Sequence, residues 1–307
     1  MQNQQVERES VTVEATDGYE LAARRFSARD RRPRGVVIIN GATGVTQRFY
    51  RRFAEMLAGA GYVAVTYDYR GVGESSPDSL RGFSAYLEHW ARDYAGVVKW
   101  ARDEHPEQPV AVIGHSIGGV LLGFEECSAQ LDAVLTVAAG TAYYGDRPFG
   151  RRLATRVTNT ALHGLALAFG YLPASKLRAG EDLPTGIVEE LSWRARYPDF
   201  RAQIAARGLT PNFDQVRAPL LSIGISDDSE STPAAIDRLH RLYSSAEIEM
   251  IELGSVDDSS DAIGHFGFFR ARHEDTMWPH ATRWLERALP RRAIRHDAWT
   301  SAASMRL

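Results

Sequence analysis

Val110-Ala111-Val112-Ile113-Gly114-His115-Ser116-Ile117-Gly118-Gly119 joins an apolar run to the pattern Gly-x-Ser-x-Gly, and an apolar segment from Val120 to Leu122 follows. This order predicts a buried strand, a tight turn and a helix. A serine on such a turn adopts a strained backbone conformation that lifts its hydroxyl clear of the sheet, and the flanking glycines avoid collisions with the strand and the helix. The pattern alone arises by chance in roughly one chain in ten of this length. The flanking elements therefore carry the argument that Ser116 is a nucleophile.

The composition is that of a globular protein with a large core. The 307 residues are 44% hydrophobic, and 36 basic and 39 acidic residues give a net charge of -3. This balance favours neither nucleic acid nor a membrane surface as a partner. The start Met1–Arg8 has no apolar signal segment, and no run approaches the ~18 apolar residues of a membrane-spanning helix. We therefore expect a cytoplasmic protein that binds neither nucleic acid nor membranes.

Strands and helices alternate along most of the chain after an initial hairpin. Asp17-Gly18 separates two alternating segments, which predicts an antiparallel hairpin of residues 11–15 and 19–26. Six more strands are expected, and they give an α/β fold with a mostly parallel eight-stranded sheet and helices on both faces. The active site of such a sheet lies at the carboxyl ends of the strands. The expected strands are residues 35–40, 62–69, 110–115, 131–138, 219–225 and 248–253, and the expected helices are residues 47–60, 84–104, 232–243 and 276–288.

The alternation stops between residues 141 and 216, where the sequence is helical and irregular. We expect a helical lid or cap inserted there into a core formed by residues 1–140 and 217–307. The tail from Pro290 is expected to be loosely packed. Most of the large apolar side chains of the lid should bury its own helices, while some line a substrate cavity. These side chains are Tyr143, Tyr144, Leu162, Leu165, Leu167, Phe169, Tyr171, Trp193 and Phe200.

A serine nucleophile needs a base, and an acid that orients the base, in the chain order serine, acid, histidine. His265 follows the last expected strand in a flexible loop and is the candidate base. His115 adjoins Ser116, but its side chain cannot easily reach back to the serine hydroxyl. The other seven histidines fall in expected helices, at helix ends or in the tail.

Two adjacent aspartates follow the strand that begins at Pro219. Counting from Pro219 favours Asp228 as the acid, whereas counting from Gly224 favours Asp227. We expect Asp228, and the alternative stays open. Three further aspartates are weaker rivals because they lie on the histidine's own loop, and these are Asp257, Asp258 and Asp261.

Stabilisation of an oxyanion requires two backbone N–H donors. One should be that of Ile117, directly after the nucleophile, and the other should come from the loop after the third strand, Asn40–Gly44. The small residues of this loop allow its backbone to face a substrate. We expect Ala42 to supply the second donor, with Thr43 as the alternative.

Four motifs together resemble the α/β-hydrolase superfamily, within the group related to serine aminopeptidases, monoacylglycerol lipases and uncharacterised predicted hydrolases. They are Gly114–Gly119, the stretch Asp68-Tyr69-Arg70-Gly71-Val72-Gly73-Glu74-Ser75, the Asp227-Asp228 pair and Gly264-His265. The resemblance covers nearly all of the chain except the lid. One departure is Asn40-Gly41, where relatives usually have His-Gly.

The resemblance does not fix the reaction, because one fold hosts many chemistries. The main hypothesis is a serine hydrolase that cleaves an ester or thioester of a mainly apolar small molecule through an acyl-Ser116 intermediate. An acyltransferase would use the same residues with an acceptor other than water. A non-catalytic binding protein is the third hypothesis, which the complete set Ser116, Asp228 and His265 disfavours. The oligomeric state is left open, with a dimer as one option.

The sequence predicts neither a metal nor a cofactor. It has no Cys/His cluster with metal-ligand spacing, and Gly71-Val72-Gly73 lacks the third glycine and the helix of a dinucleotide site. The single cysteine, Cys127, cannot form an internal disulfide. We expect it to be a buried, inert thiol in the helix after Ser116.

Overall fold

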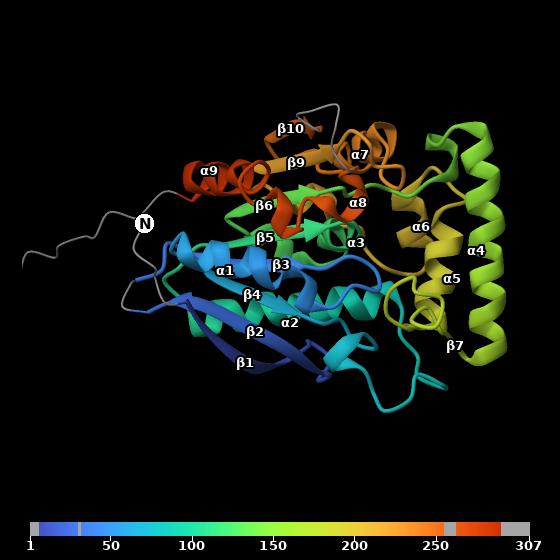
Figure 1. Cartoon of the computed structure of the whole chain (residues 1–307), viewed down its shortest axis with the longest axis horizontal. Helices are drawn as coiled ribbons and strands as arrows, with labels where there is room; N and C mark the ends of the chain where they lie inside the picture. Colours follow the sequence, from blue (N-terminus) through green and yellow to red (C-terminus); the bar gives the residue numbers. More distant parts are fainter. Residues whose placement is uncertain (1–5, 30–31, 255–261, 290–307) are drawn as a thin grey trace, which may run out of the picture.

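A computed structural model describes residues 6–29, 32–254 and 262–289, and one eight-stranded sheet runs through this part of the chain (Figure 1). Its strand order is β1-β2-β4-β3-β5-β6-β9-β10. The pairs β1–β2 and β2–β4 are antiparallel, and every other neighbouring pair is parallel. The predicted mostly parallel sheet is therefore confirmed. The strands span Val6–Glu14 (β1), Glu20–Ala28 (β2), Val36–Asn40 (β3), Val63–Tyr67 (β4), Val110–His115 (β5), Ala133–Val137 (β6), Leu220–Ile225 (β9) and Ile248–Leu253 (β10).

The turn between β1 and β2 follows the sequence prediction. Gly18 has a φ of 86°, a left-handed conformation that glycine adopts without strain. The two strands pair along their whole length, from Glu14 opposite Glu20 to Val6 opposite Ala28.

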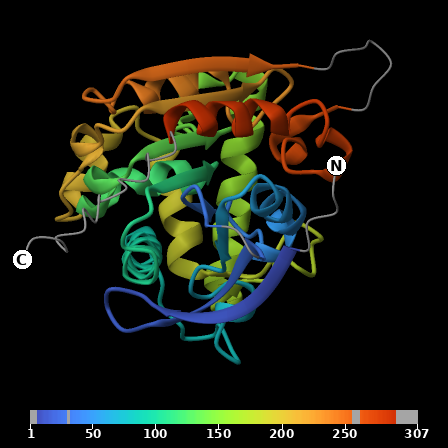
Figure 2. The same cartoon turned by 90° about the vertical axis from the view of Figure 1, so that its left-hand side faces the viewer.

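Helices cover both faces of the sheet, as predicted. On one face α2 packs against the sheet through Trp90, Tyr94 and Val97, and on the other α1 and α9 pack through side chains such as Phe53 and Trp278. Figure 2 shows α1 (blue) and α2 (teal) on opposite sides of the sheet. The central strands are buried on both faces, which explains their continuous apolar runs. The helices of the core are Arg51–Gly59 (α1), Leu87–Glu104 (α2), Ile117–Val120 (α3), Pro233–His240 (α7), Gly264–Gly267 (α8) and Trp278–Ala288 (α9).

The chain between β6 and β9 forms a block of helices beyond the carboxyl ends of the parallel strands, and we call residues 141–216 the inserted segment. The longest of its helices, α4, lies at the outer edge of the molecule (Figure 1). It packs against α5 and the short strand β7. The elements of the inserted segment are Phe149–Phe169 (α4), Tyr171–Leu172 (β7), Leu183–Pro184 (β8), Thr185–Arg194 (α5) and Phe200–Ala206 (α6).

The helix expected after Ser116 is shorter than predicted. After one turn, α3 gives way to two 3₁₀ segments, Leu121–Phe124 and Glu126–Gln130. The carbonyl of Gly123 accepts the N–H of Asn212, and a Cβ at Gly123 would lie 2.2 Å from the Phe213 ring. The end of the inserted segment thus occupies the space and the hydrogen-bonding group that a continued helix would use. Cys127 therefore lies in a 3₁₀ segment, partly buried, and desolvation raises the pKa of its thiol to about 12.

Candidate active site

Ser116 lies between β5 and α3 in a strained conformation, with φ 53° and ψ -117°. Its N–H donates to the carbonyl of Val137, so the neighbouring strand holds the turn. A Cβ at Gly118 would lie 2.3 Å from the Asn40 carbonyl oxygen, and one at Gly114 would lie 2.5 Å from Gly119. Only glycine fits these two positions, which is the packing reason for the Gly-x-Ser-x-Gly pattern. The side chain of Ser116 is partly exposed and accepts no hydrogen bond from the described residues.

The structure brings His265 and Asp228 together. His265 is in the short helix α8, and its Nδ1 lies 2.7 Å from Asp228 Oδ2. The Asp228 side chain is fully buried, and its other oxygen accepts the N–H groups of Glu230 and Ser231. With two backbone N–H groups on one oxygen of Asp228, its other oxygen faces His265 Nδ1. This contact suits the tautomer with the proton on Nδ1, which leaves Nε2 to accept a proton.

Asp227 has a different environment from its neighbour. Its two carboxylate oxygens accept the N–H groups of Ile263 and Gly264, at 2.7 and 2.8 Å, and it is exposed. Asp227 therefore holds the backbone that enters α8, while Asp228 meets the imidazole. The rival acids Asp257, Asp258 and Asp261 lie outside the described residues.

The candidate oxyanion donors differ in their partners. The N–H groups of Ile117 and Thr43 have no acceptor among the described residues. The N–H of Ala42 donates to Tyr50 Oη at 2.8 Å. Asn40, which replaces the usual histidine, is fully buried and joins Tyr67 to the Gly118 carbonyl. The loop after β3 is thus anchored at its start, and Ala42 must exchange partners to reach a substrate.

His115 is a site neighbour whose role the sequence argument missed. It is completely buried, its Nδ1 lies 2.8 Å from Tyr50 Oη, and its Nε2 lies 2.9 Å from the His265 carbonyl oxygen. Burial, with a further contribution from His265, lowers the pKa of His115 to about 3. A neutral His115 therefore connects the loop of Ala42 to the helix of His265. The signal in the sequence was a polar residue at the end of a strand that is otherwise apolar.

The loop after β4, quoted above as a family motif, is structural. Asp68 accepts the N–H groups of Gln47 and Glu74, and the Arg70 guanidinium binds the carboxylates of Asp17 and Asp93. These contacts tie the hairpin, the loop and α2 together beside the loop of Ala42.

The inserted segment is bonded to both loops of the site. Arg147 donates to the carbonyls of Ser229 and Glu230, directly after Asp228. On the other side, the N–H of Glu181 donates to the Gly44 carbonyl. The inserted segment thus connects the loop after Asp228 to the loop after β3 that contains Ala42. Of its expected pocket residues, Phe200 and Tyr144 are buried, whereas Leu167 and Phe169 face solvent.

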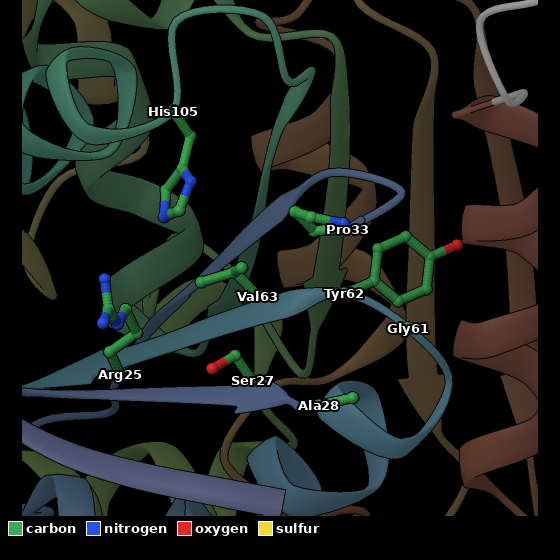
Figure 3. A pocket seen from close by; sticks show the side chains of 8 residues that line it. All are labelled: Arg25, Ser27, Ala28, Pro33, Gly61, Tyr62, Val63 and His105. Carbon is green, nitrogen blue, oxygen red and sulfur yellow. The ribbon is translucent and has the colours of Figure 1, made fainter. Parts of the chain in front are cut away.

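A cavity of about 240 Å³ lies at the opposite end of the sheet (Figure 3). It opens where Gly61, Tyr62 and Val63 lead into β4, and its wall includes Arg25 and His105. None of its lining residues belongs to the candidate site, so this cavity is separate from the carboxyl ends of the strands where Ser116 lies.

Comparison with protein families matches residues 31–246 to a family model described as "Serine aminopeptidase, S33". Among individual proteins, a monoacylglycerol lipase of Mycolicibacterium smegmatis is 34% identical over 92 residues, which are 29% of this chain and 31% of that protein. The putative esterase YheT of Escherichia coli is 24% identical over 302 aligned positions, covering 91% of this chain and 82% of that protein.

Solved structures share the fold at low sequence identity. A soluble variant of the monoglyceride lipase of Saccharomyces cerevisiae superposes with a TM-score of 0.66 at 15% identity, covering 93% of this chain and 96% of that one. A thermostable carboxyl esterase of Bacillus coagulans gives a TM-score of 0.65 at 12% identity, covering 92% and 99%. At these identities the likeness concerns the fold alone.

Proposed function

Because the chain belongs to the serine aminopeptidase S33 family of α/β-hydrolases, we propose that it cleaves carboxylic esters or thioesters of mainly apolar small molecules. Membership of this family supports hydrolase activity. The observation that carries the proposal is the 2.7 Å contact between His265 Nδ1 and Asp228 Oδ2. It is supported by the strained turn that holds Ser116. A binding protein without catalysis has no need for a buried carboxylate that fixes one histidine tautomer.

The first half of the reaction forms an acyl-enzyme. Ser116 Oγ attacks the carbonyl carbon while His265 Nε2 takes the hydroxyl proton, and the imidazolium is stabilised by Asp228. His265 then gives this proton to the departing alcohol or thiol, and the acyl group remains on Ser116. In the second half, water attacks the acyl carbon, His265 takes one of its protons, and the acid leaves with Ser116 restored.

The negative charge that develops on the carbonyl oxygen needs donors already in place. The Ile117 N–H has no acceptor within the described part of the chain and adjoins the nucleophile. For the second donor, we retain Ala42, which requires its N–H to leave Tyr50 when substrate binds. Thr43, whose N–H also lacks an acceptor among the residues that the structure describes, is the alternative.

A matched pair of experiments tests the proposal. The wild type should hydrolyse p-nitrophenyl esters and be labelled by a fluorophosphonate probe at Ser116. Ser116→Ala should lose both turnover and labelling while keeping the wild-type unfolding transition, since the hydroxyl is partly exposed and makes no hydrogen bond with the described residues. Full activity in Ser116→Ala, or labelling of another residue such as Cys127, would overturn the assignment.

A further inference from the structure

The helix α4 turns an apolar face away from the protein. Phe149, Leu153, Val157 and Leu167 are 80%, 57%, 62% and 64% exposed. At 100° per residue these four side chains fall within an arc of about 80° on the helix. Among the exposed residues within this arc, Thr160 is the polar one. We call these four residues the outer face of α4.

The opposite side of α4 is occupied by the protein itself. Ala166 is completely buried, and Leu162 and Leu165 pack against the core. Asn159 donates to Tyr144 Oη, which fixes the rotation of the helix. The outer face therefore cannot turn inward without breaking these contacts. An apolar stripe held in this way marks a surface that meets a partner.

The outer face has a basic side chain at its border. Arg156 lies about 20° outside the arc, is exposed, and has no acidic partner in the part of the chain that the structure describes. The sequence from residue 147 to 180 contains no aspartate or glutamate, although the whole chain has a net charge of -3. The net charge of the whole chain hides this local excess. Within residues 147–180 the basic residues are Arg147, Arg151, Arg152, Arg156, Lys176 and Arg178.

The charge pattern distinguishes between the partners that an apolar helix face can meet. In a second copy, α4 also lacks acidic residues, so pairing of two such helices brings arginines together with no carboxylate between them. The surface of an anionic bilayer offers both an apolar layer and a layer of phosphate groups. A basic helix with an apolar face fits that arrangement.

We propose that α4 docks the protein on anionic phospholipid membranes. The helix, about 30 Å long, lies in the plane of the interface with Phe149, Leu153 and Val157 among the acyl chains and Arg156 at the phosphates. Among the described residues no helix is long and apolar enough to cross a membrane, so the attachment is peripheral. This inference goes beyond the proposed ester hydrolysis and does not depend on it.

Flotation of the full chain with vesicles tests the proposal. The wild type should float with vesicles that contain phosphatidylglycerol and not with pure phosphatidylcholine, and added salt should release it. Leu153→Glu/Val157→Glu should weaken the binding at least tenfold. Arg156→Gln should weaken it roughly fivefold. Met250→Glu, which changes a half-exposed apolar side chain on the distant strand β10, is the control and should bind like the wild type.

Three results would overturn the proposal. They are a wild type that does not float, equal binding to neutral and anionic vesicles, and wild-type binding by Leu153→Glu/Val157→Glu. A wild-type dimer in analytical ultracentrifugation that this double variant abolishes, without any flotation, would assign the outer face to a second copy instead. The lipid and salt dependence of the wild type decides the question even if the double variant does not fold.

Discussion

The two adjacent aspartates should respond very differently to the same isosteric change. In Asp228→Asn, the single amide oxygen can still accept the N–H groups of Glu230 and Ser231. The amide nitrogen then faces His265 Nδ1 at the position of the present 2.7 Å contact. Because the amide is a donor, it stabilises the tautomer with the proton on Nε2, which cannot accept the proton of Ser116.

The size of the effect follows from this change of tautomer. Neutralising the acid of a serine triad lowers kcat by about 10⁴, which corresponds to roughly 5.5 kcal/mol of transition-state stabilisation. We expect a loss of 10³ to 10⁴ for Asp228→Asn. Asp227→Asn keeps one acceptor for the two N–H groups of Ile263 and Gly264, and water can reach this exposed site. We therefore expect a loss of about tenfold or less, near 1.4 kcal/mol.

The assay is kcat and KM for a p-nitrophenyl ester, measured for both variants beside the wild type. Urea denaturation of each variant separates a catalytic loss from unfolding. Equal losses in the two variants, or a larger loss for Asp227→Asn, would refute the assignment of Asp228 as the acid that orients His265.

Three further predictions concern the network around the site and the substrate. The folded-state pKa of His115 is about 3, below its ordinary 6.5, so its contribution to stability is present above pH 6.5 and is lost as the pH falls towards 3. Between pH 7.5 and 5.5 the wild type should therefore lose about 1.4 kcal/mol more unfolding free energy than His115→Gln, measured by urea titration. Equal losses in the two proteins would contradict a neutral buried imidazole. Tyr50→Phe leaves the Ala42 N–H and His115 Nδ1 unpaired, and should lower the unfolding free energy by about 1–3 kcal/mol, whereas an unchanged urea midpoint would show that water replaces the hydroxyl. For p-nitrophenyl esters, kcat/KM should rise roughly fourfold per added acyl carbon until the pocket fills; a flat profile, or a preference for peptides with a free amino terminus, would point to a polar site.

Local patterns in the sequence were sufficient for the sheet and for the turn at Ser116. The strands β3 to β6 are buried on both faces, so their residues are apolar without interruption and the run itself marks the strand. The glycines at 114 and 118 are required by contacts within a few residues of the serine or with one neighbouring strand. The Gly-x-Ser-x-Gly pattern that satisfies these constraints is visible in a short window of sequence.

The choice between Asp227 and Asp228 could not be made in this way. Both residues follow β9 in a turn, and neighbouring side chains of a turn point in different directions. Their separation into two roles depends on where α8 lies, 37 residues further along the chain. Counting residues from the start of the strand, or from a glycine within it, contains no information about that distant helix.

The orientation of α4 was also beyond the sequence pattern. Apolar residues occur around most of its circumference, so periodicity does not indicate which side is buried. The structure selects the side that carries Asn159 and Ala166, because Tyr144 and Thr185 form hydrogen bonds there. As a consequence Leu167, expected to bury the lid or line its pocket, is 64% exposed.

The neutrality of His115 has a direct consequence for His265. The two rings are 5.2 Å apart between centroids. In the network, Ala42 donates to Tyr50 Oη, so the Tyr50 hydroxyl proton is free to go to His115 Nδ1, and His115 Nε2–H donates to the His265 carbonyl. A charged His115 would have donors on both nitrogens and would repel a second positive charge on His265. By remaining neutral, His115 holds the backbone of His265 in place and still allows that imidazole to take the proton of Ser116.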